Sequence, residues 1–307
     1  MSRTILVDCN SVGRAAHSAT KLTVGTQQTQ AVFGTIRSIR DALRSHPGFT
    51  PVALWDERAQ WRFDLHPDYK GKRNETPEQQ QDTAAYKSQT PFIERALHTL
   101  GVRQMRAANY EADDLAGFLV AGLTNKPENE IILITGDKDW AQLIRPNVTW
   151  NDHRNDSKML TVANLFERTG YRTPMAFLEG KVLQGDDSDG ISGVGGIGKK
   201  GAPEFLAEFG SVRNFLARCD SGDFIPKKKA HVNLASKSGR ALLLRNFKLM
   251  QLLKVAKPSR EALVVDNGAY DEDAFRALCE ELCFLSIIRN ADTFNHFVAP
   301  FKALAGA

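Results

Sequence analysis

The stretch GDDSDGISGVGGIGKKGA, from Gly185 to Ala202, combines a group of carboxylates with a glycine-rich segment that ends in two lysines. Carboxylates crowded into one turn repel one another unless a cation neutralises them, and such oxygen-rich positions suit Mg²⁺ or Mn²⁺. The glycines permit a tight hairpin between two helices, because glycine accepts positive φ and lets a ligand approach the backbone. Amide groups and lysines at the start of the second helix suit a phosphate. A metal site beside a phosphate-binding hairpin predicts an enzyme that cuts nucleic acid.

The composition is that of a globular protein with one large or two ordinary domains, since 42% of the 307 residues are hydrophobic and 25% are charged. The net charge of +4 is small, so binding to nucleic acid requires local basic patches beside an acidic pocket. No neighbouring His or Cys pair completes a zinc set, and we expect buried thiols at Cys9, Cys219, Cys279 and Cys283. Because we find neither a signal segment nor a long apolar run, we expect a cytoplasmic protein without a membrane span.

Acidic residues follow three apolar segments that have the pattern of buried parallel strands. Asp8 ends the segment 4–8, Asp56 ends the segment 51–56, and Asp137 follows the segment 130–135. Because the carboxyl ends of parallel strands meet at one edge of a sheet, we expect these acids to lie close together. More acids, in the sequence EADD at 111–114, begin a predicted helix. One of them would suffice as a helix cap, so a capping role and a role in binding metal both remain open for this group.

The segment 66–90 is polar, basic at its start and almost free of large aliphatic residues, which predicts a surface excursion that includes a mobile helical loop. Lys70, Lys72 and Arg73 form a cationic cluster within it. A plain solvated loop is the alternative. After Ala202 the chain has mainly helical patterns, and the lysine run at 227–229 is more typical of a solvated face than of a DNA contact.

Six motifs occur in the order that is characteristic of the 5′-nuclease superfamily. They are VD at 7–8, WD at 55–56, PDYKGKR at 67–73, EADD at 111–114, TGDKD at 135–139 and the stretch 185–202. The sequence therefore resembles bacteriophage flap endonucleases of the T5 type and the 5′-nuclease domain of bacterial DNA polymerase I, from about Thr4 to Phe209. The resemblance implies an α/β fold with a mixed, largely parallel central sheet flanked by helices, a PIN-like 5′-nuclease core. It also implies a helical arch and a C-terminal helix–two-turn–helix DNA-binding region.

The resemblance further implies a domain division and two sets of metal ligands. A nuclease core would span 1–173 with the arch at about 66–90, and a helical region would span 174–307, with its clamp at about 176–210, and pack back on the core. The first metal would be bound by Asp8, Asp56, Glu111, Asp113 and Asp114, and the second by Asp137, Asp139, Asp186 and Asp189. Asp187 falls between two matched positions and is interpreted as a solvated neighbour.

Basic residues and the hairpin supply the remaining sites that the resemblance implies. Lys70 and Arg73 would be catalytic, because they would contact the scissile phosphate and offset its developing charge. DNA would be bound by Lys72, Lys181, Gly193, Gly195, Gly196, Gly198, Lys199 and Lys200. Backbone carbonyls of Ser192, Val194 and Ile197 would hold K⁺.

The function implied is that of a Mg²⁺-dependent 5′ nuclease, with Mn²⁺ able to substitute, that hydrolyses 5′ flaps and 5′ ends by a two-metal-ion mechanism in replication or repair. Its partners would be branched or 5′-ended duplex DNA, an RNA primer–DNA hybrid, and a replication polymerase or single-strand-binding protein. We expect a monomeric, stand-alone enzyme of phage type. The alternatives are a processive 5′-3′ duplex exonuclease and a non-catalytic protein that binds DNA junctions. A Toprim-type fold also places acids after strands, but it would not explain the hairpin or the YKGKR sequence.

Overall fold

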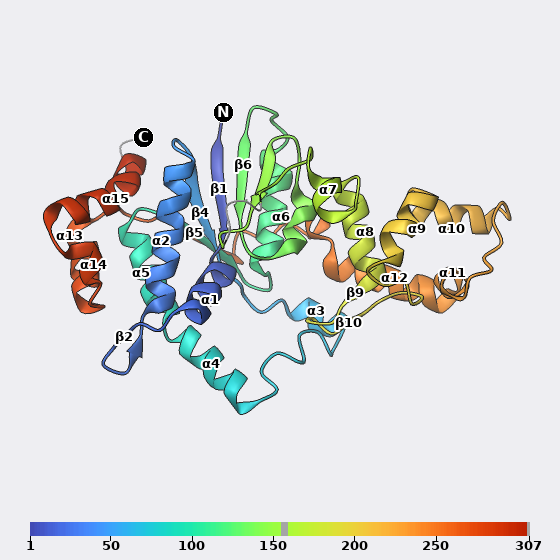
Figure 1. Ribbon diagram of the computed structural model, residues 1–307, viewed down its shortest axis with the longest axis horizontal. Coiled ribbons are helices and arrows are strands. Elements are labelled where there is room, and N and C mark those ends of the chain that lie inside the picture. Colours follow the sequence, from blue (N-terminus) through green and yellow to red (C-terminus); the bar gives the residue numbers. More distant parts are fainter. Residues whose placement is uncertain (155–158, 306–307) are drawn as a thin grey trace.

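The computed structural model describes residues 1–154 and 159–305, and a seven-stranded sheet lies at its centre (Figure 1). The strand order is β11-β5-β4-β1-β6-β7-β8, in which β5, β4, β1, β6 and β7 are parallel and the two edge strands are antiparallel. The strands are β1 Arg3–Asp8, β4 Thr50–Leu54, β5 Arg103–Ala107, β6 Glu130–Ile134, β7 Val148–Asn151, β8 Met159–Leu160 and β11 Leu263–Asp266. The predicted fold class is confirmed.

Helices cover both faces of the sheet, because the central strands are apolar on both sides. In β1, Ile5 and Val7 join one buried cluster while Leu6 joins the other. The first cluster is closed by α1 Cys9–Ala19, α2 Gln30–Ser45, α5 Thr90–Thr99, α13 Glu272–Glu281, α14 Leu285–Ile288 and α15 Ala291–Ala305. The second is closed by α6 Ala112–Leu123, the 3-10 helices η1 Lys138–Leu143 and η3 Leu252–Lys254, and α7 Leu165–Thr169 and α8 Pro174–Gln184.

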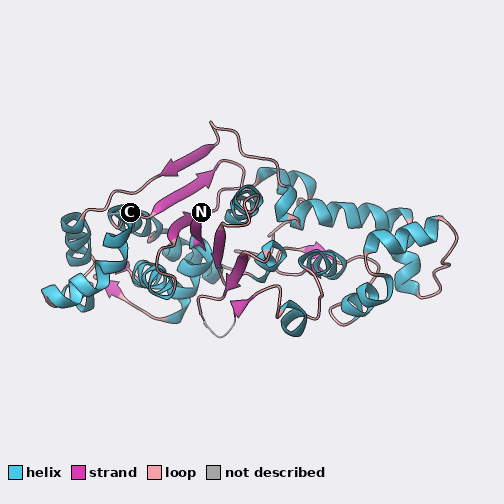
Figure 2. Ribbon diagram, turned by 90° about the horizontal axis from the view of Figure 1, so that it is seen from above, coloured by secondary structure: helices cyan, strands magenta, loops and turns pink. Residues whose placement is uncertain are grey.

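A helical extension projects from one side of the sheet (Figures 1 and 2). Its aromatic residues continue the buried cluster of one face of the sheet. It contains the short hairpin of β9 Gly185–Asp186 and β10 Ile191–Ser192, followed by α9 Gly201–Phe209, α10 Val212–Asp220, α11 Lys229–Ala235 and α12 Lys237–Met250. The rings of Phe205, Phe209, Phe215 and His231 lie within 5.5 Å of one another, centroid to centroid. Aromatic pairs at such distances stabilise the part of this cluster that lies in the extension.

The C-terminal residues return to the sheet. Strand β11 pairs with β5, and α13 and α15 place Phe275, Phe294 and Phe301 in the same buried cluster as α2 and α5. Residues 263–305 therefore belong physically to the core. The helical pattern of this segment predicted the helices but not which layer they would join.

The segment 66–90, expected to be an arch, consists of turns followed by α4 Pro77–Lys87, and it joins α3 Gln60–Leu65 to α5. Thr76 and Gln79 form a capping box at the start of α4, in which each side chain accepts the backbone N–H of the other. Such a box satisfies two free amides of the first turn and fixes where the helix begins. Most of the segment is exposed, and in Figure 1 it lies along one end of the sheet, beneath α1 and α3.

None of the helices within residues 1–154 and 159–305 is both long enough and apolar enough to cross a membrane.

A buried carboxyl in α8 makes the stability of the fold depend on pH. Burial raises the pKa of Glu179 to about 7, against an ordinary value of 4.5. Because the folded-state pKa is raised, the protonated form is favoured, and stability is lost as the pH rises from the unfolded-state value through about 7. We expect Glu179→Gln to be more stable than the wild type by roughly 1–2 kcal/mol at alkaline pH, after allowance for solvent screening.

Urea unfolding at about pH 5 and about pH 8 checks this expectation, because the difference should be larger at the higher pH. Glu167→Gln, at an exposed position of α7, is the control and should change nothing at either pH. An advantage of Glu179→Gln that is equal at both pH values would contradict the explanation.

Candidate active site

The sheet topology brings the predicted acids to one edge. Strands β5, β4, β1 and β6 are adjacent and parallel, and their carboxyl ends lead to Glu111, Asp56, Asp8 and Asp137, in that order. Glu111 immediately precedes α6, and Asp137 immediately precedes η1. The expectation that Asp8, Asp56 and Asp137 converge is therefore met by the strand order.

Hydrogen bonds fix the acids of the central strands. The Asp8 carboxylate accepts bonds from the Ser11 amide at 2.9 Å and from the Thr135 hydroxyl at 2.8 Å. Asp56 accepts one from the Ala112 amide at 2.8 Å, so the WD motif caps the start of α6. These contacts hold the side chains in place without neutralising their charge.

Two further, half-buried acids complete this group. Asp113 accepts a bond from the Trp140 indole N–H at 2.6 Å, and Asp137 accepts one from the Asp139 amide at 2.7 Å. Burial and the neighbouring Asp56 and Asp137 raise the pKa of Asp8 to about 7. Burial and then Asp137 and Asp8 raise the pKa of Asp113 well above its ordinary value. These shifts indicate closely spaced negative charge without a compensating cation in the protein.

Glu111 lies between this acid group and the start of the arch. Its carboxylate contacts the Lys70 ammonium at 2.6 Å and the Tyr69 hydroxyl at 3.0 Å. Burial alone would raise the pKa of Glu111, but Lys70 and Arg62 hold it below the ordinary value. In this conformation Lys70, predicted to contact phosphate, is paired with a predicted metal ligand.

Asp114 does not face the acid group, and its prediction as a metal ligand is not supported by the geometry. Both of its oxygens are bound by the Arg62 guanidinium at 2.6 Å, and one also accepts the Glu111 amide at 2.9 Å. Asp114 is fully buried and Arg62 is 2% exposed. An acid engaged in this way has no free oxygen directed at the sheet edge. The cap interpretation of the EADD motif holds for Asp114.

Basic side chains also form ion pairs with the acids of the second predicted set. The Lys181 ammonium lies 2.9 Å from Asp139 and 2.8 Å from Asp186, and Arg73 lies 2.5 Å from Asp189. Lys181, predicted to bind DNA, is thus placed between two acids instead of facing solvent. Burial and Asp137 raise the pKa of Asp139 to about 6 even though Lys181 opposes the shift.

A small cavity joins the two acid sets, since it is lined by Asp113, Asp139, Asp186 and Asp189 together with Arg62 and Tyr69. Among residues 1–154 and 159–305, no three His, Cys, Asp or Glu side chains are arranged closely enough to enclose one metal ion. Lys70 and Arg73 each pair with one carboxylate, and Lys181 lies between two. The donor chemistry nevertheless fits a divalent cation, because buried Asp8 and half-buried Asp113 and Asp137 are carboxylates with raised pKa values and no cationic partner among their hydrogen bonds.

The glycine-rich loop forms the predicted hairpin between α8 and α9. Gly195 and Gly196 have φ values of 70° and 82°, and a Cβ on Gly195 would come within 2.6 Å of the Ala230 carbonyl oxygen. These two glycines are therefore required by the backbone. Lys199 and Lys200 are exposed just before α9, and Lys72 is exposed near the start of the arch segment. Of the carbonyls predicted to hold K⁺, that of Ser192 accepts the Asn246 amide at 2.8 Å and that of Val194 accepts the Ile197 amide at 3.2 Å.

Several residues of the site were not predicted from the sequence. Arg62 and Tyr69 orient Asp114 and Glu111, and Thr135 and Trp140 bind Asp8 and Asp113. The only sequence feature that singles out Arg62 is its place between two aromatic residues in a short amphipathic helix. Thr135 and Tyr69 lie inside motifs that we recognised by the charged residues next to them.

Two family models match consecutive parts of the chain. The N-terminal resolvase-like domain of 5′-3′ exonucleases matches residues 3–170, and the C-terminal SAM fold of 5′-3′ exonucleases matches residues 172–261. The chain belongs to the 5′-3′ exonuclease family. The predicted membership of the 5′-nuclease superfamily is confirmed.

Curated relatives are similar over one part of their length. DNA polymerase I of Bacillus caldotenax is 30% identical over 298 residues, which are 94% of this chain and 32% of the relative. DNA polymerase I of Lactococcus lactis is 32% identical over 198 residues, which are 63% of this chain and 22% of the relative. The chain spans about a third or less of the curated relatives it matches.

Solved structures show the same fold. The bacteriophage T5 flap endonuclease in a complex with DNA and metal ions aligns with a TM-score of 0.66 and 21% identity, over 99% of this chain and all of that chain. The catalytic core of Rad2 in complex with DNA substrate aligns with a TM-score of 0.61 and 17% identity, over 98% of this chain and 93% of that one. At these identities the likeness establishes the architecture, and the chemistry must be argued from the residues.

Proposed function

We propose that this member of the 5′-3′ exonuclease family is a metal-dependent, structure-specific 5′ nuclease that hydrolyses phosphodiester bonds at 5′ flaps and 5′ ends of duplex DNA. The observation that carries the proposal is the convergence of acids from four adjacent strand ends, next to the basic start of the arch. Closely spaced carboxylates that cannot neutralise one another provide a site for divalent cations. Lys70 and Arg73 beside them provide a site for the phosphate that is to be cut.

The acids divide into two groups by position. Asp8, Asp56, Asp113 and Glu111 would hold one Mg²⁺, and Asp137, Asp139, Asp186 and Asp189 would hold a second, with Mn²⁺ as a substitute. Bound ions would supply an activated water and stabilise the leaving oxygen. We assign Asp114 to a structural role, because Arg62 already binds both of its oxygens.

The cations of the protein would change partners when substrate binds. Lys70 and Arg73 now pair with Glu111 and Asp189. A phosphate that draws both cations away would release two carboxylates toward the metal positions, so that substrate and metal would support each other's binding. Lys70 and Arg73 would then orient the scissile phosphate and offset its developing charge.

The hairpin would bind the duplex away from the cut. Exposed Lys199 and Lys200 before α9 and the closely approachable Gly195–Gly196 backbone suit phosphates independently of base sequence. K⁺ coordinated by carbonyls of Ser192, Val194 and Ile197 is part of the same proposal. An RNA primer–DNA hybrid would be accepted for the same reason, since the contacts are to the backbone.

The test uses a duplex with a labelled 5′ flap, incubated with Mg²⁺ or with EDTA, and resolves the length of the products. Cleavage near the flap junction that requires Mg²⁺ is the expected result. A ladder of products shortened one nucleotide at a time from the 5′ end would indicate processive exonuclease action instead of a preference for flaps. Binding of intact DNA with Mg²⁺ and with Mn²⁺ would reject the enzyme in favour of a junction-binding protein.

A further inference from the structure

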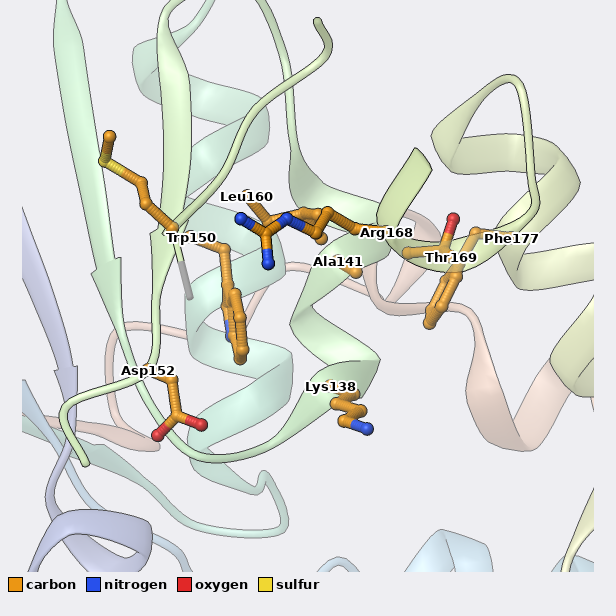
Figure 3. Close-up of a pocket in the computed structure, with 9 residues that line it drawn as sticks. Lys138, Ala141, Trp150, Asp152, Leu160, Arg168, Thr169 and Phe177 are labelled. Atoms are coloured by element: carbon orange, nitrogen blue, oxygen red, sulfur yellow. The ribbon is translucent and has the colours of Figure 1, made fainter. Parts of the chain in front are cut away.

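Two hollows in the surface differ in how much of their apolar lining is open to solvent. The one beside η1 and the β7–β8 pair (Figure 3) has a volume of about 380 Å³ and is lined by Trp150 and Phe177 among others. These two side chains are only 5% and 8% exposed, so they are already packed in the core. The other hollow, of about 620 Å³, lies between α3, α12 and residues 251–256. Both volumes fall within the ~300–1,000 Å³ range of ligand pockets, so the exposure of the lining decides between them.

The second hollow, here called the α3–α12 groove, has an open apolar lining. Its apolar residues include Trp61 and Leu65 of α3, Leu244 and Phe247 of α12, and Val255. Leu244 is 63% exposed, and the other four are half-buried. An apolar strip that a protein leaves uncovered in this way is typical of an interaction site.

One face of α12 has no partner inside the chain. Residues 244, 247 and 248 recur at helical spacing and so share a face, which lines the groove. Leu243, Asn246 and Met250 recur at the same spacing on the other side of the helix and are buried. A further hollow of about 350 Å³ beside α10 is also lined by Leu244 and Phe247, so the apolar strip continues across α12.

The charge of the groove indicates what kind of partner fits. Lys248 and Lys254 line it and are both exposed, and none of the described residues that line it is acidic. Neither lysine forms an ion pair within the part of the chain that the structure describes. Unpaired cations beside an apolar strip complement a partner that carries carboxylates next to an apolar side chain.

Single-stranded DNA is also negatively charged, but the lining suits a peptide better. Leu244, the most exposed large apolar residue of the groove, offers no π-face on which a base could stack. The Arg62 guanidinium lies 4.4 Å from the centroid of the Trp61 ring and covers one face of it. The Tyr110 hydroxyl and the Gln251 amide make no side-chain hydrogen bond to any described residue, so they are available to a peptide backbone.

We propose that the α3–α12 groove binds a short acidic peptide segment of a partner protein. An apolar side chain of the peptide would rest on Leu244 and Phe247, and its carboxylates would pair with Lys248 and Lys254. The groove shares no lining residue with the cavity of the predicted active site, so a bound peptide would not occupy that site. The inference goes beyond the proposed nuclease function and does not depend on it.

The first test measures fluorescence anisotropy of labelled pentapeptides with the full chain, in EDTA and without DNA. The probes are Glu-Glu-Leu-Glu-Glu and the same peptide with Phe or Trp at its centre. We expect saturable binding of at least one of them with a Kd below about 1 mM. Replacing the four glutamates by glutamine, or the central residue by serine, should weaken binding about tenfold or more. The proposal is overturned if none of the three acidic probes saturates in this range.

Charge reversal tests the role of the lysines. Lys248→Glu with Lys254→Glu should weaken binding of the acidic peptide about tenfold or more, because attraction becomes repulsion. The matched control, Lys21→Glu with Lys126→Glu, changes the net charge equally at two exposed positions outside the groove and should retain the wild-type affinity. Equal weakening by both double variants would mean that the peptide responds to net charge alone, which contradicts a site.

The apolar contact is tested with two exposed leucines. Leu244→Gln should weaken binding about fivefold or more, because the contact with the central side chain is lost. Leu285→Gln is the control, since Leu285 is 67% exposed in α14 and does not line the groove. Circular dichroism verifies that both variants are folded. An unchanged affinity of Leu244→Gln would overturn the proposed seat of the peptide.

Photocrosslinking locates the bound peptide. With benzoylphenylalanine as its central residue, the peptide should label residues 60–65 or 244–256. Label confined to the basic hairpin 185–202 or to the arch segment 66–90 would overturn the proposal. An oligothymidylate that displaces the peptide from the wild type, and binds more weakly to Leu244→Gln, would assign the groove to single-stranded DNA instead.

Discussion

Simultaneous replacement of Asp137 and Asp139 by asparagine is expected to abolish cleavage of a 5′-flap duplex, with the rate falling by about a thousandfold or more. The two acids belong to the turn that follows β6, where Asp137 faces Asp8 and Asp113, and Asp139 faces Lys181 and Asp186. Asparagine keeps the size and the Asp139 N–H hydrogen bond but removes two negative charges. Loss of several kcal/mol of metal-borne stabilisation in the transition state corresponds to that factor.

Binding separates this explanation from a loss of fold. Affinity for the flap duplex should be retained or increased, because removing two carboxylates from beside Lys181 and the phosphate path reduces repulsion. Asp187→Asn is the matched control, since Asp187 is exposed in the adjacent turn and lines no part of the acid cavity. Undiminished cleavage by the Asp137, Asp139 variant, together with normal binding, would show that the acids of β6 have no part in the chemistry.

The sequence predicted the strands that carry the site better than it predicted the partners of each acid. Apolar runs that end in Asp8, Asp56 and Asp137 are local patterns, and their convergence follows from parallel pairing, which the structure has. Motif order alone could not assign Asp114. Its side chain is bound by Arg62, which lies 52 residues earlier in the chain. Such a contact depends on how α3 packs against α6, and no spacing within either segment encodes it.

The same limit applies where the arch meets the hairpin. The Lys70 amide donates to the Asp189 carbonyl at 3.0 Å, and the His66 ring lies 2.9 Å from the Gly190 carbonyl oxygen. A Cβ on Gly190 would come within 2.7 Å of the Asp68 carbonyl oxygen, so this glycine permits the contact. Each motif was recognised separately, but their contact through the backbone is a tertiary feature. It explains why Lys70 and Arg73 reach acids that are far away in the chain.

Replacement of Arg62 by methionine is expected to destabilise the folded protein by about 3–5 kcal/mol, the range found when one partner of a buried ion pair is removed. Arg62 donates two bonds of 2.6 Å to Asp114 and one of 3.2 Å to the Leu249 carbonyl. Methionine fills a similar volume but leaves Asp114 buried without a cation. Urea unfolding followed by circular dichroism measures the loss. Arg58→Met is the control, because Arg58 is exposed, stacks on Phe63 and donates one exposed hydrogen bond to Gln60.

The unpaired charge, and not the lost volume, is what should dominate this effect. Adding Asp114→Asn to Arg62→Met removes the buried charge while the asparagine oxygen can still accept the Glu111 amide, so the double variant should recover a large part of the stability. Equal stability of the single and double variants would mean that packing around Arg62, including its contact with Trp61, accounts for the loss. Recovery of stability would instead show that the buried charge of Asp114 causes the loss. Because a required metal ligand could not be neutralised without loss of cleavage, the cleavage assay of the double variant then tests whether Asp114 has only a structural role. The double variant, once stable, should therefore retain Mg²⁺-dependent cutting, in contrast to the Asp137, Asp139 variant.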